Sequence, residues 1–99
     1  MINLINTKQR AYLRSLAQTI SPIFQVGKNG ITDSLIVDLN NALEARELIK
    51  ITILNTIPGD KNEIAREISE RTNSELVQLV GNKLTLYKQS INKAKIELP

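Results

Sequence analysis

Apolar side chains recur every three or four residues in three segments of the chain, a spacing that places them on one face of an α-helix. Asn6 with Gln9, and Asp60 with Glu63, have the spacing of capping boxes, in which two side chains satisfy the first amides of a helix. The sequence therefore predicts three amphipathic helices, which run from about Thr7 to Thr19, from about Asp33 to Arg46, and from just after Asp60 to about Arg71.

Four shorter segments are rich in aliphatic and β-branched residues. The clearest is Leu48–Leu54, where β-branched residues alternate with polar ones as they do in a strand. Gly81-Asn82 separates two other such segments and has the composition of a two-residue hairpin turn of the glycine-first type. The predicted strands cover residues 23–26, 48–54, 76–80 and 84–87.

The predicted order of elements is α-β-α-β-α-β-β. Helix-length connections should make the first three strands parallel where they are neighbours, and the final hairpin should add an antiparallel edge. No linker, repeat or low-complexity tract divides the 99 residues. We therefore expect one α/β (α+β) domain over residues 1–99, in which a four-stranded mixed sheet packs with three helices. Its core should cover about residues 4–90, and residues 91–99 should form a loose, lysine-bearing tail.

The segment 26–33 joins a predicted strand to a predicted helix through Gly27-Lys28-Asn29-Gly30. Glycine allows a positive φ or the close approach of a ligand, and Thr32 or Asp33 can cap the helix. The loop amides would then lie near the positive end of the helix dipole, where Lys28 adds a full charge. This loop is a candidate phosphate site, although Asn-Gly is so common in turns that a simple turn explains the same residues.

Charge is divided unevenly along the chain, which carries 13 basic and 10 acidic residues. Residues 1–32 contain four basic residues and no acid, and residues 83–95 contain four lysines and no acid. Residues 33–82 contain five basic residues and nine acids. If the fold joins the two ends, they form a basic surface whose natural partner is a polyanion.

On the first predicted helix, Arg10 and Arg14 lie on one flank of the apolar stripe, and Lys8 lies on the other side. Like charges four residues apart repel, and cations in the first turn oppose the helix dipole. Both effects lower helix stability slightly, so they hint at a ligand. A solvated basic flank without a ligand explains the same charges.

Cysteine and histidine are absent, so disulfides, thiolate or imidazole metal ligands and the usual general base are excluded. We expect no enzyme activity, no cofactor and no metal. The first six residues lack the features of a signal peptide, and no apolar span is long enough to cross a membrane, so we expect a cytoplasmic protein. The acids are ordinary in number and fall where solvated helix faces are expected: Asp38, Glu44, Glu63, Glu67 and Glu70.

Several separated motifs occur in a recognisable order: Lys8–Ala17, Pro22, Val26–Thr32, Glu47–Ile51, Gly81-Asn82-Lys83 and Leu86-Tyr87-Lys88. Together they resemble the CRM domain, named for chloroplast RNA splicing and ribosome maturation, and in particular its small stand-alone bacterial members of the YhbY type. The resemblance extends from about Leu4 to Ser90 and is far more specific than the glycine loop alone.

The resemblance implies an RNA-binding fold related to the C-terminal domain of bacterial translation initiation factor three, with a GxxG loop like that of KH domains. It also implies association with ribosomal RNA in precursors of the large ribosomal subunit. Lys83 and Lys88 are weaker candidates for RNA contacts, and Lys50 could equally be a solvated residue of a polar sheet face. The family's RNA-binding residues, carried onto this sequence, are Gly27, Lys28, Asn29 and Gly30, with Lys8, Arg10 and Arg14 beside them.

Four positions depart from the family pattern. Gln18 and Ala45-Arg46 stand where histidines are frequent, and Lys88 stands where many members have arginine. Lysine keeps the charge but loses the bidentate fork of arginine, which puts a planar phosphate contact at Lys88 in doubt.

Aromatic residues are too few for a base-stacking platform, since Tyr12, Phe24 and Tyr87 are the three that the sequence contains. Any RNA binding should thus depend on phosphate contacts and shape. The alternative function is a protein-interaction adaptor, in which the acidic face of the third helix contacts a basic ribosomal protein through Glu63, Glu67 and Glu70. No long exposed apolar stripe indicates an obligate dimer, so we expect a monomer.

Overall fold

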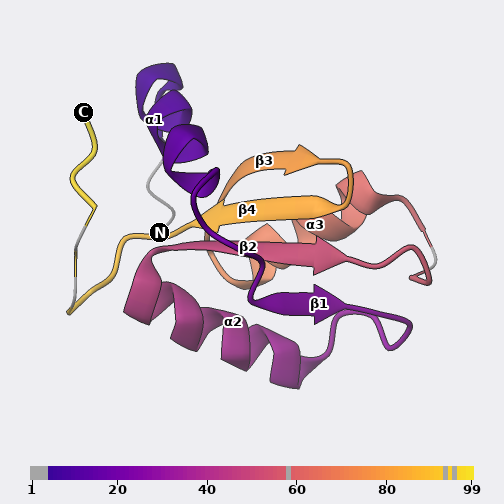
Figure 1. The fold of residues 1–99 in the computed structure, drawn as a ribbon. Helices are drawn as coiled ribbons and strands as arrows, with labels where there is room; N and C mark the ends of the chain where they lie inside the picture. The colour runs from indigo at the N-terminus through magenta and orange to yellow at the C-terminus, as the bar shows by residue number, and fades with distance from the viewer. Residues whose placement is uncertain (1–4, 58, 93, 95) are drawn as a thin grey trace.

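The computed structural model describes residues 5–57, 59–92, 94 and 96–99. Its elements follow the predicted order: α1 (Thr7–Ala17), β1 (Phe24–Val26), α2 (Asp33–Arg46), β2 (Leu48–Ile53), α3 (Lys61–Arg71), β3 (Glu75–Val80) and β4 (Lys83–Tyr87) (Figure 1). The predicted fold class is confirmed, because these elements form one α+β domain with a four-stranded mixed sheet and three helices.

Local sequence signals fix both ends of α1. The Asn6 side chain accepts the Gln9 amide, and the Gln9 side chain accepts the Asn6 amide, so the predicted capping box is confirmed. The helix ends at Ala17 rather than at Thr19. The reason is that the Thr19 amide bonds a carbonyl three residues back, which tightens the last turn ahead of Pro22.

The cap of α2 agrees with the sequence, and the cap of α3 agrees with it in part. Thr32 caps α2, since its hydroxyl accepts the Leu35 amide at 3.1 Å. At α3 the Asp60 carboxylate accepts the Asn62 amide at 3.0 Å, one position before Glu63. The predicted cap residue is therefore correct, but the predicted capping box with Glu63 is wrong.

The strands lie in the order β1-β2-β4-β3. β1 is parallel to β2, while β4 is antiparallel to both β2 and β3, so the first three strands share one direction. The hairpin forms an edge of the sheet through β3, as predicted, but its second strand lies inside the sheet. Burial explains this order: Leu84 and Leu86 of β4 are fully buried, whereas Val80 of β3 is 62% exposed.

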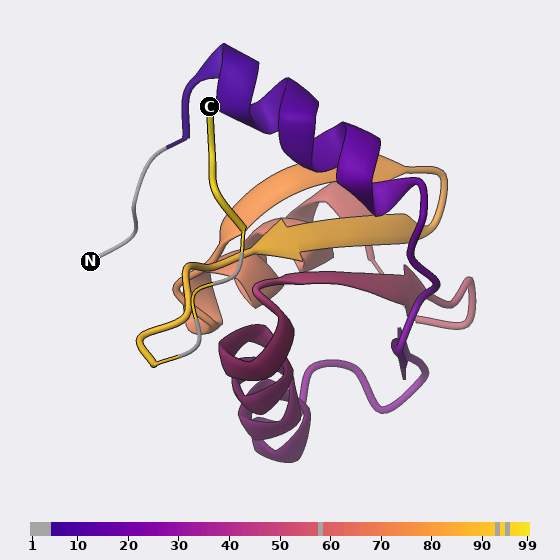
Figure 2. The same cartoon turned by 60° about the vertical axis from the view of Figure 1, so that its left-hand side comes forward.

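Helices cover both faces of the sheet (Figures 1 and 2). On one face, α2 and α3 form the main core with the strands, through Leu39, Leu43, Ile49, Ile51, Ile53, Ala65, Ile68, Leu84 and Leu86. On the other face, α1 packs through Leu13 and Ala17 on Leu48, Val77 and Tyr87. Leu48 begins β2 and Tyr87 ends β4, so α1 covers the end of the sheet at which β2 starts.

Two apolar side chains near the C-terminus, Ile96 and Leu98, are packed on the domain, which corrects the predicted loose tail for the described part of this segment. Ile96 and Leu98 contact the apolar cluster beneath α1, and the Gln9 side-chain amide donates to the Pro99 carbonyl at 3.2 Å. Ile96 and Leu98 are separated by one residue, and this spacing of two apolar side chains was the sequence signal for a packed segment. Lys93 and Lys95, which were expected in the tail, lie outside the described residues.

Two carboxylates of α2 and its C-cap bind this C-terminal segment. Glu47 is fully buried and has a φ of 67°, and its carboxylate accepts the Ser90 amide at 2.9 Å and the Ile96 amide at 2.8 Å. Glu44 accepts the Ser90 hydroxyl at 2.6 Å and the Ile91 amide at 3.0 Å. Glu44 is thus a partner of this segment and does not lie on the solvated helix face that the sequence predicted.

Tyr87 is buried. Burial, reinforced by the negative charge of Glu47, raises the pKa of the Tyr87 phenol above 10.0. The unfolded chain therefore ionises first as pH rises, and the contribution of Tyr87 to stability is present below pH 10 and lost above it. We predict that the unfolding free energy falls less between about pH 9 and about pH 11 in Tyr87→Phe than in the wild type. Urea denaturation at the two pH values tests this, with Tyr12→Phe, at an exposed site, as the matched control. Equal falls in all three proteins would contradict the prediction.

Candidate nucleic-acid interface

The segment Gly27–Gly30 forms a tight turn at the end of the sheet where β1 and β2 both finish. The Gly30 amide donates to the Gly27 carbonyl at 2.8 Å, and the Leu54 amide, just past β2, donates to the Val26 carbonyl at 2.9 Å. Gly30 has a φ of 69°, in the region that favours glycine. A Cβ at Gly27 would lie 3.5 Å from Leu54 Cδ1, which is an ordinary contact. Of the two glycines, Gly30 is therefore the one that the backbone conformation requires.

The turn borders an open hollow of about 510 Å³. Lys28 and Asn29 are exposed at its rim, and Gly27 and Gly30 are half-buried. The turn is thus not sealed beneath its own side chains, and a ligand can approach its backbone. The hollow is lined by Phe24, Gln25, Gly27, Lys28, Asn29, Gly30, Thr32, Ser34, Leu35 and Asp38.

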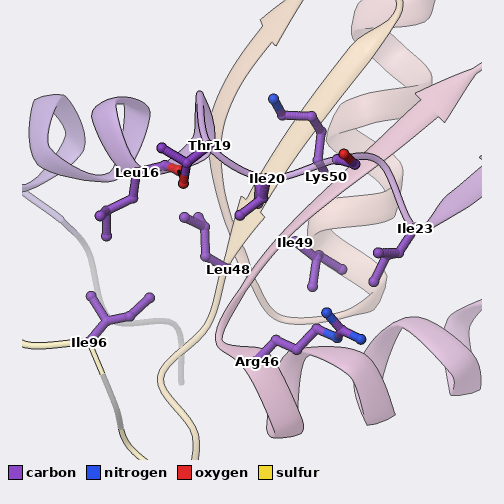
Figure 3. A pocket seen from close by; sticks show the side chains of 10 residues that line it. Leu16, Thr19, Ile20, Ile23, Arg46, Leu48, Ile49, Lys50 and Ile96 are labelled. Carbon is purple, nitrogen blue, oxygen red and sulfur yellow. Dashed lines mark hydrogen bonds between the residues drawn. The ribbon is translucent and has the colours of Figure 1, made fainter.

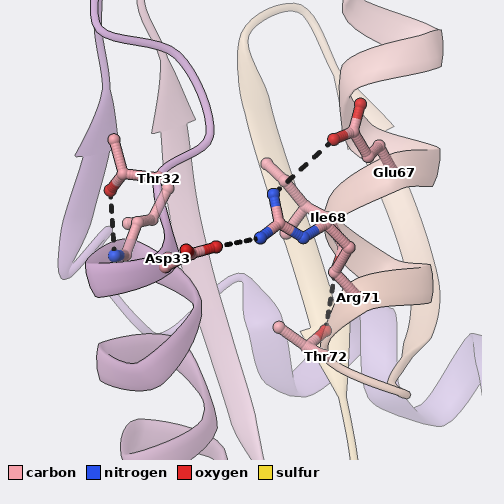
Figure 4. A network of polar contacts seen from close by, with 7 residues as sticks. Thr32, Asp33, Glu67, Ile68, Arg71 and Thr72 are labelled. Atoms are coloured by element: carbon pink, nitrogen blue, oxygen red, sulfur yellow. Dashed lines mark hydrogen bonds and ion pairs between the residues drawn. The ribbon is translucent and has the colours of Figure 1, made fainter.

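α2 begins directly after the turn. The first amides of a helix have no carbonyl partner within it, so they and the helix dipole favour an anion there. Asp33 would repel such an anion, but its carboxylate is directed at Arg71 of α3, with an N–O distance of 2.7 Å (Figure 4). Arg71 also lies 3.8 Å from Glu67. A cation from α3 therefore offsets the charge of Asp33 next to the turn.

The β3–β4 hairpin lies at the same end of the sheet as the turn, because the Ile53 amide donates to the Asn82 carbonyl at 2.8 Å. Lys83 begins β4, and its ammonium donates to the Thr52 hydroxyl at 3.1 Å. Lys28 and Lys83, from distant parts of the sequence, thus belong to one end of the sheet.

The groups available at this end are backbone amides, lysine ammonium groups and hydroxyls, which suit phosphate oxygens and sugar hydroxyls. Within the described residues, no group of three or more histidine, cysteine or acidic side chains is placed to bind a metal ion. In that same part of the chain, no helix combines the length and the apolar character needed to span a membrane.

The sequence model of the CRS1 / YhbY (CRM) domain family matches residues 5–88. The chain belongs to this family. This CRM domain is 46% identical over 96 residues to the Probable RNA-binding protein YqeI of Bacillus subtilis, a match that covers 97% of the chain and 100% of the relative. It is 36% identical over 95 residues to a Haemophilus influenzae protein named RNA-binding protein, covering 96% and 95% of the two chains.

A solved structure also matches the fold. The solution structure of the hypothetical protein SAV1595 from Staphylococcus aureus is similar to this CRM domain with a TM-score of 0.81 at 47% identity. The match covers 97% of this chain and 100% of that chain. The similarity therefore includes the whole sheet and all three helices.

The structure does not bring the basic residues of α1 to the glycine turn. α1 packs at the start of β2, and β2 separates that end of the sheet from the turn by about 17 Å, taking about 3.3 Å per residue. Lys8 and Arg14 are exposed. The Arg10 guanidinium donates to the main-chain carbonyls of Leu76 and Val77 in the edge strand β3. Arg10 thus stabilises β3, a role that the sequence analysis did not predict.

Lys88 lies at the end of the sheet opposite the turn. Its ammonium donates to the Thr72 carbonyl at 3.1 Å, at the C-terminus of α3. A cation at this position is favourable because the helix dipole is negative there. The structure therefore gives Lys88 a local structural role.

An apolar groove of about 330 Å³ lies between the C-terminal end of α1, the start of β2 and the end of α2 (Figure 3). Leu48, Ile20 and Ile96 contribute to its walls, and the exposed Arg46 borders it. Lys50 is half-buried at its margin, and Figure 3 shows the Lys50 ammonium directed away from Arg46. Lys50 is thus neither fully solvated nor part of the glycine turn.

Two threonines that were not among the predicted site residues lie on the same sheet face as Lys50 and Lys83. Thr52 is the parallel partner of Gln25 and the antiparallel partner of Lys83, and Thr85 is the partner of Lys50. Their spacing was the available signal, because residues two apart in a strand lie on one face. Polar residues at every second position of β2 and β4 therefore indicated a polar patch.

Proposed function

We propose that this CRM domain binds ribosomal RNA in precursors of the large ribosomal subunit and assists the assembly of that subunit. The observation that carries the proposal is the open Gly27–Gly30 turn, which presents Lys28 at the N-terminus of α2. The relatives that are named RNA-binding proteins support RNA as the partner.

In the proposed complex, the amides of Lys28 and Asn29 donate to phosphate oxygens, and the Lys28 ammonium adds a charged contact. Phosphate also benefits from the positive end of the α2 dipole, where Arg71 offsets the Asp33 carboxylate. Lys83 extends the cationic surface at this end of the sheet. Lys8 and Arg14 contact RNA that reaches the far end of the domain. Arg10 contributes mainly by stabilising β3, because its guanidinium is already bound to carbonyls there.

Binding of this kind depends on counterion release, because lysine and arginine displace cations from the RNA. We predict a steep salt dependence for affinity to a structured ribosomal RNA fragment, with a log-log slope of roughly −3 to −5 if about five phosphates are engaged. Fluorescence anisotropy over a range of KCl concentrations measures the slope. A nearly flat response would contradict an electrostatic interface.

The alternative adaptor has weaker support, since Arg71 lies beside Glu67 and places a cation on the acidic α3 face that a basic partner would have to approach. Limited RNase treatment of a lysate separates the two functions. We expect the treatment to release the protein from large-subunit particles on a sucrose gradient, because RNA holds it there. An adaptor bound through α3 would stay with the ribosomal proteins, and Glu63→Gln with Glu70→Gln would release it.

A further inference from the structure

Part of the sheet face that carries α1 is polar and lies beyond that helix. α1 packs on Leu48, Val77 and Tyr87. Two rows of cross-strand partners follow toward the glycine turn: the first joins β2, β4 and β3, and the second joins all four strands. We call these residues the sheet surface: Lys50, Thr85 and Gln78 in the first row, and Gln25, Thr52, Lys83 and Val80 in the second.

The sheet surface has a distinct chemical character. It contains two lysines and no carboxylate, and its other polar groups are hydroxyls and side-chain amides. Val80 is 62% exposed beside Lys83 and offers an apolar contact. Two cations next to uncharged hydrogen-bonding groups fit a polynucleotide better than a protein surface, since phosphates and base edges need these two kinds of group.

Thr85 is the most informative residue of this surface. It is 1% exposed, and its hydroxyl has no hydrogen-bond partner among the described residues. Buried hydroxyls are normally paired, as Thr72 shows by donating to the Ile68 carbonyl at 2.8 Å. A buried hydroxyl without a partner costs free energy of folding. A hydrogen-bond partner outside the domain would explain why Thr85 carries one. Lys50 and Gln78 are the cross-strand partners of Thr85, so a ligand that contacts the Thr85 hydroxyl must also contact or displace these two side chains.

We propose that the sheet surface binds a single-stranded segment of the RNA and reads one of its bases. Lys50 and Lys83 bind the phosphates, while the Thr85 hydroxyl and the Gln78 amide bond to the edge of a base. The inference rests on the proposed function, because Lys83 and the glycine turn share one end of the sheet, so one strand of RNA can contact both.

The charge contacts are tested with Lys50→Gln and Lys83→Gln combined. The probes are single-stranded oligo(U), oligo(A) and oligo(C) of about 12 nucleotides, a length that spans a typical single-strand site. We expect about tenfold weaker binding and a salt slope shallower by about 1.4, which corresponds to two lost phosphate contacts at about 0.7 each. Arg46→Gln with Arg66→Gln removes the same charge from exposed positions on α2 and α3 and should change affinity less than threefold, or about 0.65 kcal/mol.

Base reading is tested with Thr85→Val. The substitution removes an unpaired hydroxyl, so the urea midpoint should equal or exceed that of the wild type. The ratio of affinities between the tightest-binding and the weakest-binding oligomer should fall about fivefold. The salt slope should stay unchanged, because a base contact releases no counterion. Thr72→Val is the contrasting variant, and it should lower the midpoint because the Thr72 hydroxyl is bonded.

Three results would overturn the inference. The first is equal affinity of the wild type for all three oligomers. The second is a loss of stability in Thr85→Val as large as in Thr72→Val. The third is unchanged binding in the Lys50 and Lys83 variant while a glycine-turn variant loses binding, which would leave the proposed function intact. The reverse pattern, loss in the lysine variant and retention in the turn variant, would support the sheet surface and reject the turn.

Discussion

A variant that carries Gly27→Asp and Gly30→Asp is expected to lose measurable RNA binding while it remains folded. Two carboxylates would occupy the turn and repel phosphate, and two unfavourable contacts of about 1.4 kcal/mol each already weaken binding about 100-fold. Both side chains fit the space around the turn, but the backbone at Gly30 is strained for any residue other than glycine. A side chain at Gly27 makes an ordinary contact with Leu54, and a Cβ at Gly30 meets nothing within 4 Å. Aspartate at the φ of Gly30 costs about 1–3 kcal/mol.

The matched control is Asn41→Asp with Asn73→Asp. It adds the same charge at exposed positions outside the turn, and Asn73 already has a φ of 53°. Circular dichroism and urea denaturation establish folding, and anisotropy with a ribosomal RNA fragment measures affinity. The control should bind within about threefold of the wild type, since nonspecific charge effects are screened. Full affinity in the folded turn variant would reject the turn as the phosphate site.

Glu47→Ala is expected to destabilise the domain by about 2–4 kcal/mol, the largest stability effect that we predict. The substitution leaves the Ser90 and Ile96 amides without their carboxylate acceptor and opens a space where a fully buried side chain lay. Glutamate also holds a left-handed φ that most residues avoid, so its side chain must offset that strain. The midpoint of urea unfolding measures the loss.

Glu63→Ala is the matched control because Glu63 is exposed on α3, and we expect a change within about 0.5 kcal/mol. Removal of residues 91–99 should cost stability by itself and should reduce the further cost of Glu47→Ala, since both changes remove the bond between the Ile96 amide and the Glu47 carboxylate. If Glu47→Ala lowered stability no more than Glu63→Ala, the proposed attachment of the C-terminal segment would be wrong.

Much of the fold could be predicted from the sequence, because the signals are local. Asn6 and Gln9 are three residues apart and cap α1 as expected, and Thr32 is likewise three residues from the amide that it caps. The glycine turn lies between a strand and a helix for the same reason, since each neighbour carries its own short-range pattern. The capping box at Asp60 failed because its carboxylate reached the nearer Asn62 amide.

The remaining differences come from contacts between distant residues, on which a local pattern gives no information. Arg10 binds a carbonyl of Leu76, which is 66 positions away, and Glu47 binds the Ser90 amide, which is 43 positions away. The position of β4 between β2 and β3 also depends on contacts between residues that are distant in the sequence. It places Lys50 opposite Thr85, and neither residue alone indicates the other. Candidate residues in the turn were therefore easier to group than those on α1 and the sheet.

The most direct test of the central claim, that the Gly27–Gly30 turn binds RNA backbone, is an NMR titration of the ¹⁵N-labelled domain with a ribosomal RNA fragment. We expect the amide signals of Lys28, Asn29 and Gly30 to shift most, together with those of the first turn of α2. Shifts confined to the α3 face around Glu63, Glu67 and Glu70, with the turn signals unchanged, would contradict it.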